Sequence, residues 1–237
     1  LEMARVRAST PVDSLALAEA MQGFLRARIG VGKLRGPEIR ARADSVVGIR
    51  QRHLGPDDPL LAESLSTQAR IMSTVGDLAG ALPIYQRTLA IRLKAYGPAH
   101  RQVAQSYNSL GVVATQLGDF AAGGDYFRRA LDIRVKLLGP DHREVADSWA
   151  NLAYVLGESG DYLGARDARE RALSQLRQLG AKVGPTPAED DYRGLIERDA
   201  PLHRALLGAE ALPGLWERSQ SLRDPEIWAS ELLARSW

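Results

Sequence analysis

Copies of two dipeptides, Gly-Pro and Gly-Asp, recur along this chain in one register, with successive copies of each 42 residues apart. The glycines that begin them, in chain order, are Gly55, Gly76, Gly97, Gly118, Gly139 and Gly160. Recurrence of two independent marks at a period of about 20–50 residues is the signature of a repeat architecture. We therefore expect a stack of similar units, each completing its core against its neighbours.

Each dipeptide predicts a helix boundary. Glycine can adopt the left-handed conformation that ends a helix and proline cannot continue one, so Gly-Pro predicts a helix end. In Gly-Asp, the glycine ends one helix and the aspartate caps the next. After the third Gly-Pro, Asp141 is the expected N-cap, with Glu144 at the capping-box spacing. Between these joints apolar residues recur at helical spacing, as at Val103, Tyr107 and Leu110.

The joints predict three complete helix pairs and one degenerate pair. First helices are expected at 59–75, 101–117 and 143–159, and second helices at 77–96, 119–138 and 161–179. The degenerate pair is expected at 14–30 and 37–54. The predicted organisation is an N-terminal tail at 1–13, an array at 14–180 with units at 14–54, 57–98, 99–140 and 141–180, and a linker with a C-terminal helical region at 181–237.

One set of residues carries a family resemblance. Leu110-Gly111, Gly118, Phe127 and Ala130 resemble the tetratricopeptide repeat, in which a small residue of the first helix packs against an aromatic residue and an alanine of the second. The 42-residue length, with Ala-Leu-x-Ile-Arg ahead of Leu-Gly-Pro-Asp-His, is similar to the longer variant of kinesin light chains and many bacterial proteins. The resemblance implies an all-α, right-handed solenoid of antiparallel helix pairs.

The same resemblance implies where a partner would bind. In this family the first helices of successive repeats line a concave groove that holds a polypeptide. The positions that correspond to the groove are mostly small or polar, and their amides and hydroxyls can bond a peptide backbone. They are Glu63, Ser66, Arg70, Ser73, Thr74, Gln105, Asn108, Val112, Thr115, Gln116, Asp147, Tyr154 and Glu158.

The register fails beyond Gly180. Gly184-Pro185-Thr186-Pro187 predicts a linker, and the following residues are interpreted as two or three short helices. These helices are expected to cap the open end of the array, because a last repeat has no neighbour to bury its apolar face. Trp216 and Trp228 in this segment could instead contact a partner.

Residues suited to catalysis or metal binding are scarce. The chain has no cysteine, so disulfides, thiolate metal sites and cysteine nucleophiles are excluded within it. His100 and His142 occupy equivalent repeat positions, which favours capping or packing of the turns over a metal site. Motifs of serine hydrolases, zinc proteases and phosphate-binding loops are missing. We therefore expect neither an enzyme nor a cofactor or metal.

Charge and hydropathy narrow the partner class. The formal net charge is +2, from 31 basic and 29 acidic residues, with no long block of like charge. Nucleic-acid binding is therefore not expected. Apolar runs are shorter than the roughly 18 residues of a membrane span, and no secretory signal is visible. These features predict a cytoplasmic protein that does not engage a membrane.

Two functional hypotheses remain open at this stage. The leading one is a scaffold or adaptor, of a bacterial type, that binds a protein or peptide segment in the concave groove. The alternative is the regulatory or sensing arm of a larger effector, such as a caspase-like protease, a signalling ATPase or a kinase, with its catalytic part outside this chain. Self-association is compatible with both, and the sequence identifies neither the partner nor the oligomeric state.

Overall fold

The computed structural model describes residues 10–30 and 36–183, which form helices joined by turns, without a strand in those ranges. The helices are α1 (Pro11–Gly30), α2 (Pro37–His53), α3 (Pro59–Thr74), α4 (Leu78–Tyr96), α5 (Arg101–Gln116), α6 (Phe120–Leu138), α7 (Arg143–Glu158) and α8 (Tyr162–Val183). Each agrees with its expected range to within a few residues. The predicted C-terminal cap, with Trp216 and Trp228, lies outside the described residues.

Tight joints connect the two helices of each of the three complete pairs, as the Gly-Asp register predicts. Gly118 has φ 85, and the Asp119 carboxylate accepts a hydrogen bond from the backbone N–H of Ala122 at 3.0 Å. The other two joints repeat this geometry, with Asp77 bonded to Gly80 and Asp161 bonded to Gly164. A positive φ favours glycine because an L side chain is strained there, so the dipeptide fixes where the chain reverses.

The helices after the longer turns, α5 and α7, begin where expected, at Arg101 and Arg143, but the N-cap residue of α7 differs from the predicted one. The N-cap of α7 is His142 and not Asp141, and its Nδ1 accepts from the backbone N–H of Glu144 at 3.1 Å. His100 caps α5 in the same way, accepting from Gln102 at 3.2 Å. The predicted Asp141 cap is therefore wrong, since the imidazole of the next residue supplies the acceptor. The capping role expected of the two histidines is confirmed.

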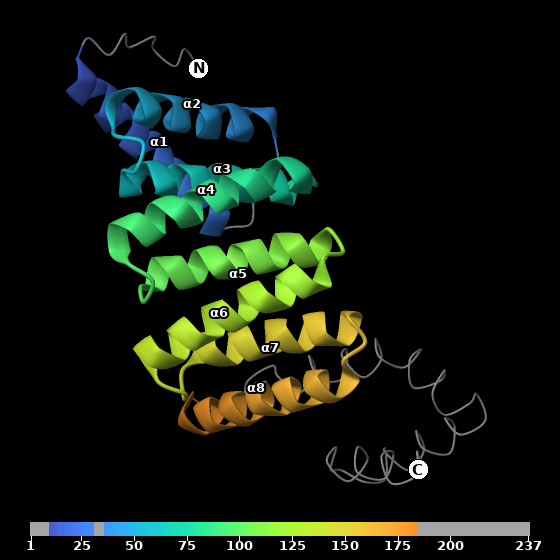
Figure 1. Cartoon of the computed structure of the whole chain (residues 1–237). Coiled ribbons are helices and arrows are strands. Elements are labelled where there is room, and N and C mark those ends of the chain that lie inside the picture. Colours follow the sequence, from blue (N-terminus) through green and yellow to red (C-terminus); the bar gives the residue numbers. More distant parts are fainter. Residues whose placement is uncertain (1–9, 31–35, 184–237) are drawn as a thin grey trace, which may run out of the picture. The chain divides into compact units, whose positions relative to one another are not determined.

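Successive helices pack against one another in sequence order, which makes a right-handed α-solenoid of antiparallel pairs (Figure 1). The core is a series of small clusters, each bridging neighbouring helices. Ala130 of α6 is fully buried against Val103 and Tyr107 of α5. The degenerate first pair also builds a core, in which Leu25 of α1 packs with Ile39 of α2. Within the described residues, each unit thus shares part of its core with a neighbouring unit.

Candidate functional site

The first helices α3, α5 and α7 leave most of the predicted groove residues accessible. Half-buried members are Glu63, Ser66, Ser73 and Asn108, and exposed members are Arg70, Thr74, Gln105, Val112, Gln116, Asp147, Tyr154 and Glu158. Arg70, Val112 and Tyr154 occupy the same repeat position, 42 residues apart, so they present a cation, an aliphatic group and an aromatic ring on successive helices.

Thr115 does not belong with this accessible set. It is only 7% exposed, and its hydroxyl donates to the carbonyl of Gly111 at 2.8 Å. A Cβ atom on Gly123 of α6 would collide with the Thr115 hydroxyl, so the side chain lies at the α5–α6 contact. Its expected place on the open face is corrected, because this helix position turns toward the second helix of the same pair.

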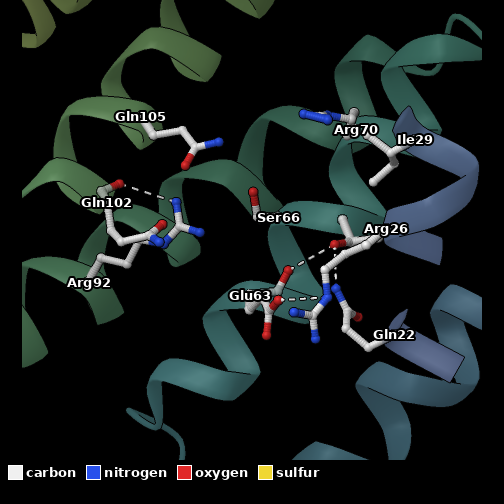
Figure 2. Close-up of a pocket in the computed structure, with 10 residues that line it drawn as sticks. Gln22, Arg26, Ile29, Glu63, Ser66, Arg70, Arg92, Gln102 and Gln105 are labelled. Atoms are coloured by element: carbon white, nitrogen blue, oxygen red, sulfur yellow. Dashed lines mark hydrogen bonds and ion pairs between the residues drawn. The ribbon is translucent and has the colours of Figure 1, made fainter. Parts of the chain in front are cut away.

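A groove of about 210 Å³ opens between the N-terminal helices (Figure 2). Its lining comes from α1, α3, α4 and α5, and comprises Gln22, Arg26, Ile29, Glu63, Ser66, Thr67, Arg70, Arg92, Gln102 and Gln105. Four predicted residues, Glu63, Ser66, Arg70 and Gln105, are brought together here. Asp147 and Tyr154 on α7 are not among the residues that line it.

Sequence reasoning missed the part of this lining that α1 and α4 contribute. Gln22, Arg26 and Ile29 belong to the degenerate unit, where the family pattern gives no positions to transfer. Arg92 lies on a second helix, which the pattern assigns to the outside. A signal for Arg92 was nevertheless present, because arginine recurs every 42 residues at Arg50, Arg92 and Arg134.

These three arginines form what we call the arginine ladder, together with Ser64, Ser106 and Ser148 of the following helices. Each Nη1 lies 2.6–2.9 Å from the serine Oγ and 2.7–3.5 Å from the carbonyl four residues before that serine. Each serine hydroxyl in turn donates to that same carbonyl. Every rung therefore joins the second helix of one pair to the first helix of the next.

The rungs differ in how their charge is balanced. Arg50 has a side chain only 2% exposed and pairs with Glu19 at 2.6 Å and Glu63 at 3.4 Å. Arg134 lies 3.6 Å from Glu144. Arg92 is 5% exposed, yet it has no ion pair with any residue in the described ranges. Its rung holds a buried positive charge without a carboxylate in contact.

Burial lowers the pKa of two of the ladder arginines, Arg92 and Arg134. Desolvation lowers the pKa of Arg92 below its usual range, and the nearby Tyr96, Glu63 and Tyr85 act in the opposite direction. Desolvation also lowers the pKa of Arg134, which Glu144 and Asp147 oppose. Arginine stays protonated at physiological pH, so the desolvation is a cost carried by the folded state.

Gln22 of α1, which also lines the groove, has a buried hydrogen-bond acceptor without a donor. The Gln22 amide nitrogen donates to the Thr67 hydroxyl at 2.8 Å, but no group in the described residues donates to its Oε1, which is buried. Gln22 is 1% exposed and lines the groove. A buried acceptor without a donor costs about 1–3 kcal/mol, so this amide oxygen destabilises the folded state.

Asn108 lies on the accessible face and also forms hydrogen bonds to two neighbouring helices. Its Oδ1 accepts from Asn151 Nδ2 at 3.1 Å and from Arg134 Nη1 at 3.4 Å. The carbonyl end of this amide is therefore committed to joining α5 with α6 and α7.

Residues 10–30 and 36–183 contain neither a candidate metal site nor a helix that could span a membrane. No cluster of three or more histidine, aspartate or glutamate residues has an arrangement that could hold a metal ion there. None of the helices in these ranges combines the length and hydropathy required to cross a bilayer.

Comparison with known proteins places the repeats. A tetratricopeptide-repeat family model matches residues 71–122 and 102–178. No curated protein sequence matches the chain significantly.

Solved structures share the fold at low sequence identity. A kinesin light chain protein of Podosopora anserina with nearly identical TPR-like repeats has a TM-score of 0.64 and 18% identity, over 94% of each chain. A Rap protein complexed with competence and sporulation factor has a TM-score of 0.58 and 18% identity, over 94% of this chain and 56% of the Rap chain. A MamA protein has a TM-score of 0.51 and 14% identity, over 71% and 78%.

Proposed function

Since this chain is a tetratricopeptide-repeat protein, we propose that it is a non-catalytic scaffold or adaptor that holds a polypeptide segment along its first helices. The observation that carries the proposal is the groove between α1, α3 and α5, which is lined by polar and charged side chains. Such a lining can bond both the backbone and the side chains of an extended segment.

Rigidity of the groove supports this proposal. Glu63 and Thr67 are held by bonds to Arg50 and Gln22, and Arg92 is fixed by the Ser106 hydroxyl and the Gln102 carbonyl. Because these side chains are already ordered, binding a partner would cost little additional conformational entropy.

Accessible apolar groups extend the same surface beyond the groove. Val112 on α5 is 38% exposed and Tyr154 on α7 is 40% exposed. Val112 lies one repeat period beyond Arg70, and Tyr154 lies two periods beyond it. A segment that continues past the groove would therefore meet an aliphatic contact at Val112 and then an aromatic one at Tyr154. Tyrosine is enriched among the residues that dominate binding energy.

The solved Rap structure gives the proposal a structural parallel. That protein, which has the same fold, is complexed with competence and sporulation factor. The tail contact through Trp216 and Trp228, self-association and the alternative of a regulatory arm remain predictions from the sequence.

Site-specific crosslinking can test the function. A photoreactive amino acid at Ser66 in the groove should crosslink a discrete set of proteins in a lysate of the source organism, identified by mass spectrometry. The same amino acid at Lys136, exposed on α6, should not crosslink that set. Adducts that are equally abundant at both positions would contradict binding in the groove.

A blocking variant makes the result quantitative. Ser66→Trp places a bulky ring in the groove, whereas Ser45→Trp adds the same ring at an exposed position of α2 outside the lining. Capture of the crosslinked proteins should be lost with Ser66→Trp and retained with Ser45→Trp.

A further inference from the structure

The Arg92 rung differs from the other two at the positions that bear acids. Glu63, which pairs with Arg50, corresponds one period later to Gln105, and Glu144, which pairs with Arg134, corresponds one period earlier to Gln102. Both glutamines line the groove beside Arg92. Two amides thus stand where the neighbouring rungs have carboxylates.

Part of the Arg92 guanidinium remains available. Nη1 is bonded to the Gln102 carbonyl and the Ser106 hydroxyl, while Nη2 and Nε make no hydrogen bond to the residues that the structure describes. In Arg50 the corresponding Nη2 holds the Glu19 carboxylate at 2.6 Å. The ladder itself therefore shows which chemical group completes such a rung.

The lining as a whole favours the same kind of ligand. It contains three arginines and a single glutamate. Arg26 is paired with Glu19 and Glu63, which leaves that glutamate already shared between Arg26 and Arg50. Arg70 is exposed and has no ion pair within the described part of the chain. Arg92 and Arg70 thus give the groove an excess of positive charge.

We propose that Arg92, Gln102 and Gln105 form a carboxylate site and that the groove's occupant is an extended polypeptide segment with an acidic side chain at this point. The guanidinium would supply the charge, and the two amides would supply N–H donors to the carboxylate oxygens. Arg70 would attract a second acidic residue of the same segment. This inference rests on the proposed function, because it specifies what the groove binds.

The chain offers a substitution that mimics the occupied site. Gln105→Glu restores the acid found at the equivalent positions of Glu63 and Asp147, so an internal carboxylate would neutralise Arg92. We expect the melting temperature to rise by about 2–4 °C, as for a modest stabilisation in a chain of this size. Gln86→Glu, at an exposed position of α4 outside the lining, makes the same charge change and should leave it unchanged.

The ligand itself is tested with a phage-displayed library of random linear peptides selected on the full chain. Selected peptides should be enriched in aspartate and glutamate and should lose binding to Ser66→Trp. Their affinity for Gln105→Glu should fall about tenfold or more, since a desolvated charge pair is lost. Gln86→Glu should bind them like the parent.

The possible failures are distinguishable. Peptides that need an open groove but show no acidic enrichment, and bind Gln105→Glu as tightly as the parent, would overturn the carboxylate site and leave the proposed function standing. Peptides that bind Ser66→Trp unchanged, or a selection that yields no binders, would overturn the proposed function and this inference with it.

Discussion

The ring of Phe127 lies against Gly111, so closely that a Cβ atom on this glycine would come within 2.7 Å of the ring. Gly111→Ala should therefore lower the free energy of unfolding by about 1–2 kcal/mol through overpacking. Gly124→Ala in α6 is the matched control, because a Cβ there meets its neighbours at 3.6 Å or more. Chemical denaturation should show the control slightly stabilised, since alanine favours a helix over glycine.

Ala130 tests the core register. It is fully buried between α5 and α6, so Ala130→Glu would place a charge among Val103 and Tyr107. We expect a loss of about 3 kcal/mol or more, the order found for an uncompensated buried charge. Ala121→Glu is the control, since residue 121 is exposed in the first turn of the same helix. In urea denaturation its free energy of unfolding should be nearly unchanged or slightly higher than that of the parent. Equal stability of Ala130→Glu and the parent would mean that the register is wrong.

The arginine ladder predicts an effect that an isolated helix would not show. Ser148→Ala removes the acceptor 2.6 Å from Arg134 Nη1 and should cost about 1–2 kcal/mol. Ser109→Ala removes a hydroxyl that bonds only within its own helix, to Gln105, and should change stability by less than about 0.5 kcal/mol. Equilibrium denaturation measures the free energy of unfolding of both variants. Equal losses in Ser148→Ala and Ser109→Ala would argue against a stabilising role for the ladder.

Asn108 is expected to affect folding as well as binding. Asn108→Ala removes the oxygen that accepts from Asn151 and Arg134, so unfolding should become easier by about 0.5–1.5 kcal/mol. Sequence reasoning alone would assign this residue only to the partner surface. Thermal melts of Asn108→Ala and Asn151→Ala should show similar losses, and the double variant should lose less than their sum.

Arg70 and Tyr154 test the partner surface itself. Arg70→Ala and Tyr154→Ala should each weaken binding of a crosslinked partner by about 1–2 kcal/mol. Both side chains are exposed, so stability should shift by no more than about 0.5 kcal/mol. Calorimetric titration measures the first effect and melting curves the second. Arg128→Ala, exposed on α6, is the control for removing an arginine.

Much of the fold could be predicted because its signals are local. Gly118 and Asp119 act through their own turn, and the 42-residue spacing then sets the register of every other joint. Ala130 and Gly111 could be placed because the family pattern specifies where small residues meet an aromatic ring. His142 instead of Asp141 at the N-cap is a one-residue difference between two competent acceptors, which the sequence cannot resolve.

The candidate site was less predictable because it depends on tertiary contacts. An arginine in a helix is normally taken as solvent-exposed, and only the packed structure shows Arg92 buried beneath Ser106 and Gln102. The wall supplied by Gln22 comes from a helix whose sequence has drifted from the repeat. Both Arg92 and Gln22 are held by hydrogen bonds to residues of another helix, and such contacts cannot be inferred from the local sequence.

The constant spacing of the arginine ladder also bears on how such a chain can grow. Each rung needs an arginine and a serine 14 residues further on. A tandem duplication of any 42-residue stretch that contains both an arginine and a serine of the ladder recreates that spacing, either inside the copy or across the new junction. The added unit thus already has the arginine and the serine that join it to its neighbours, so the array can lengthen by recombination without first evolving a new interface.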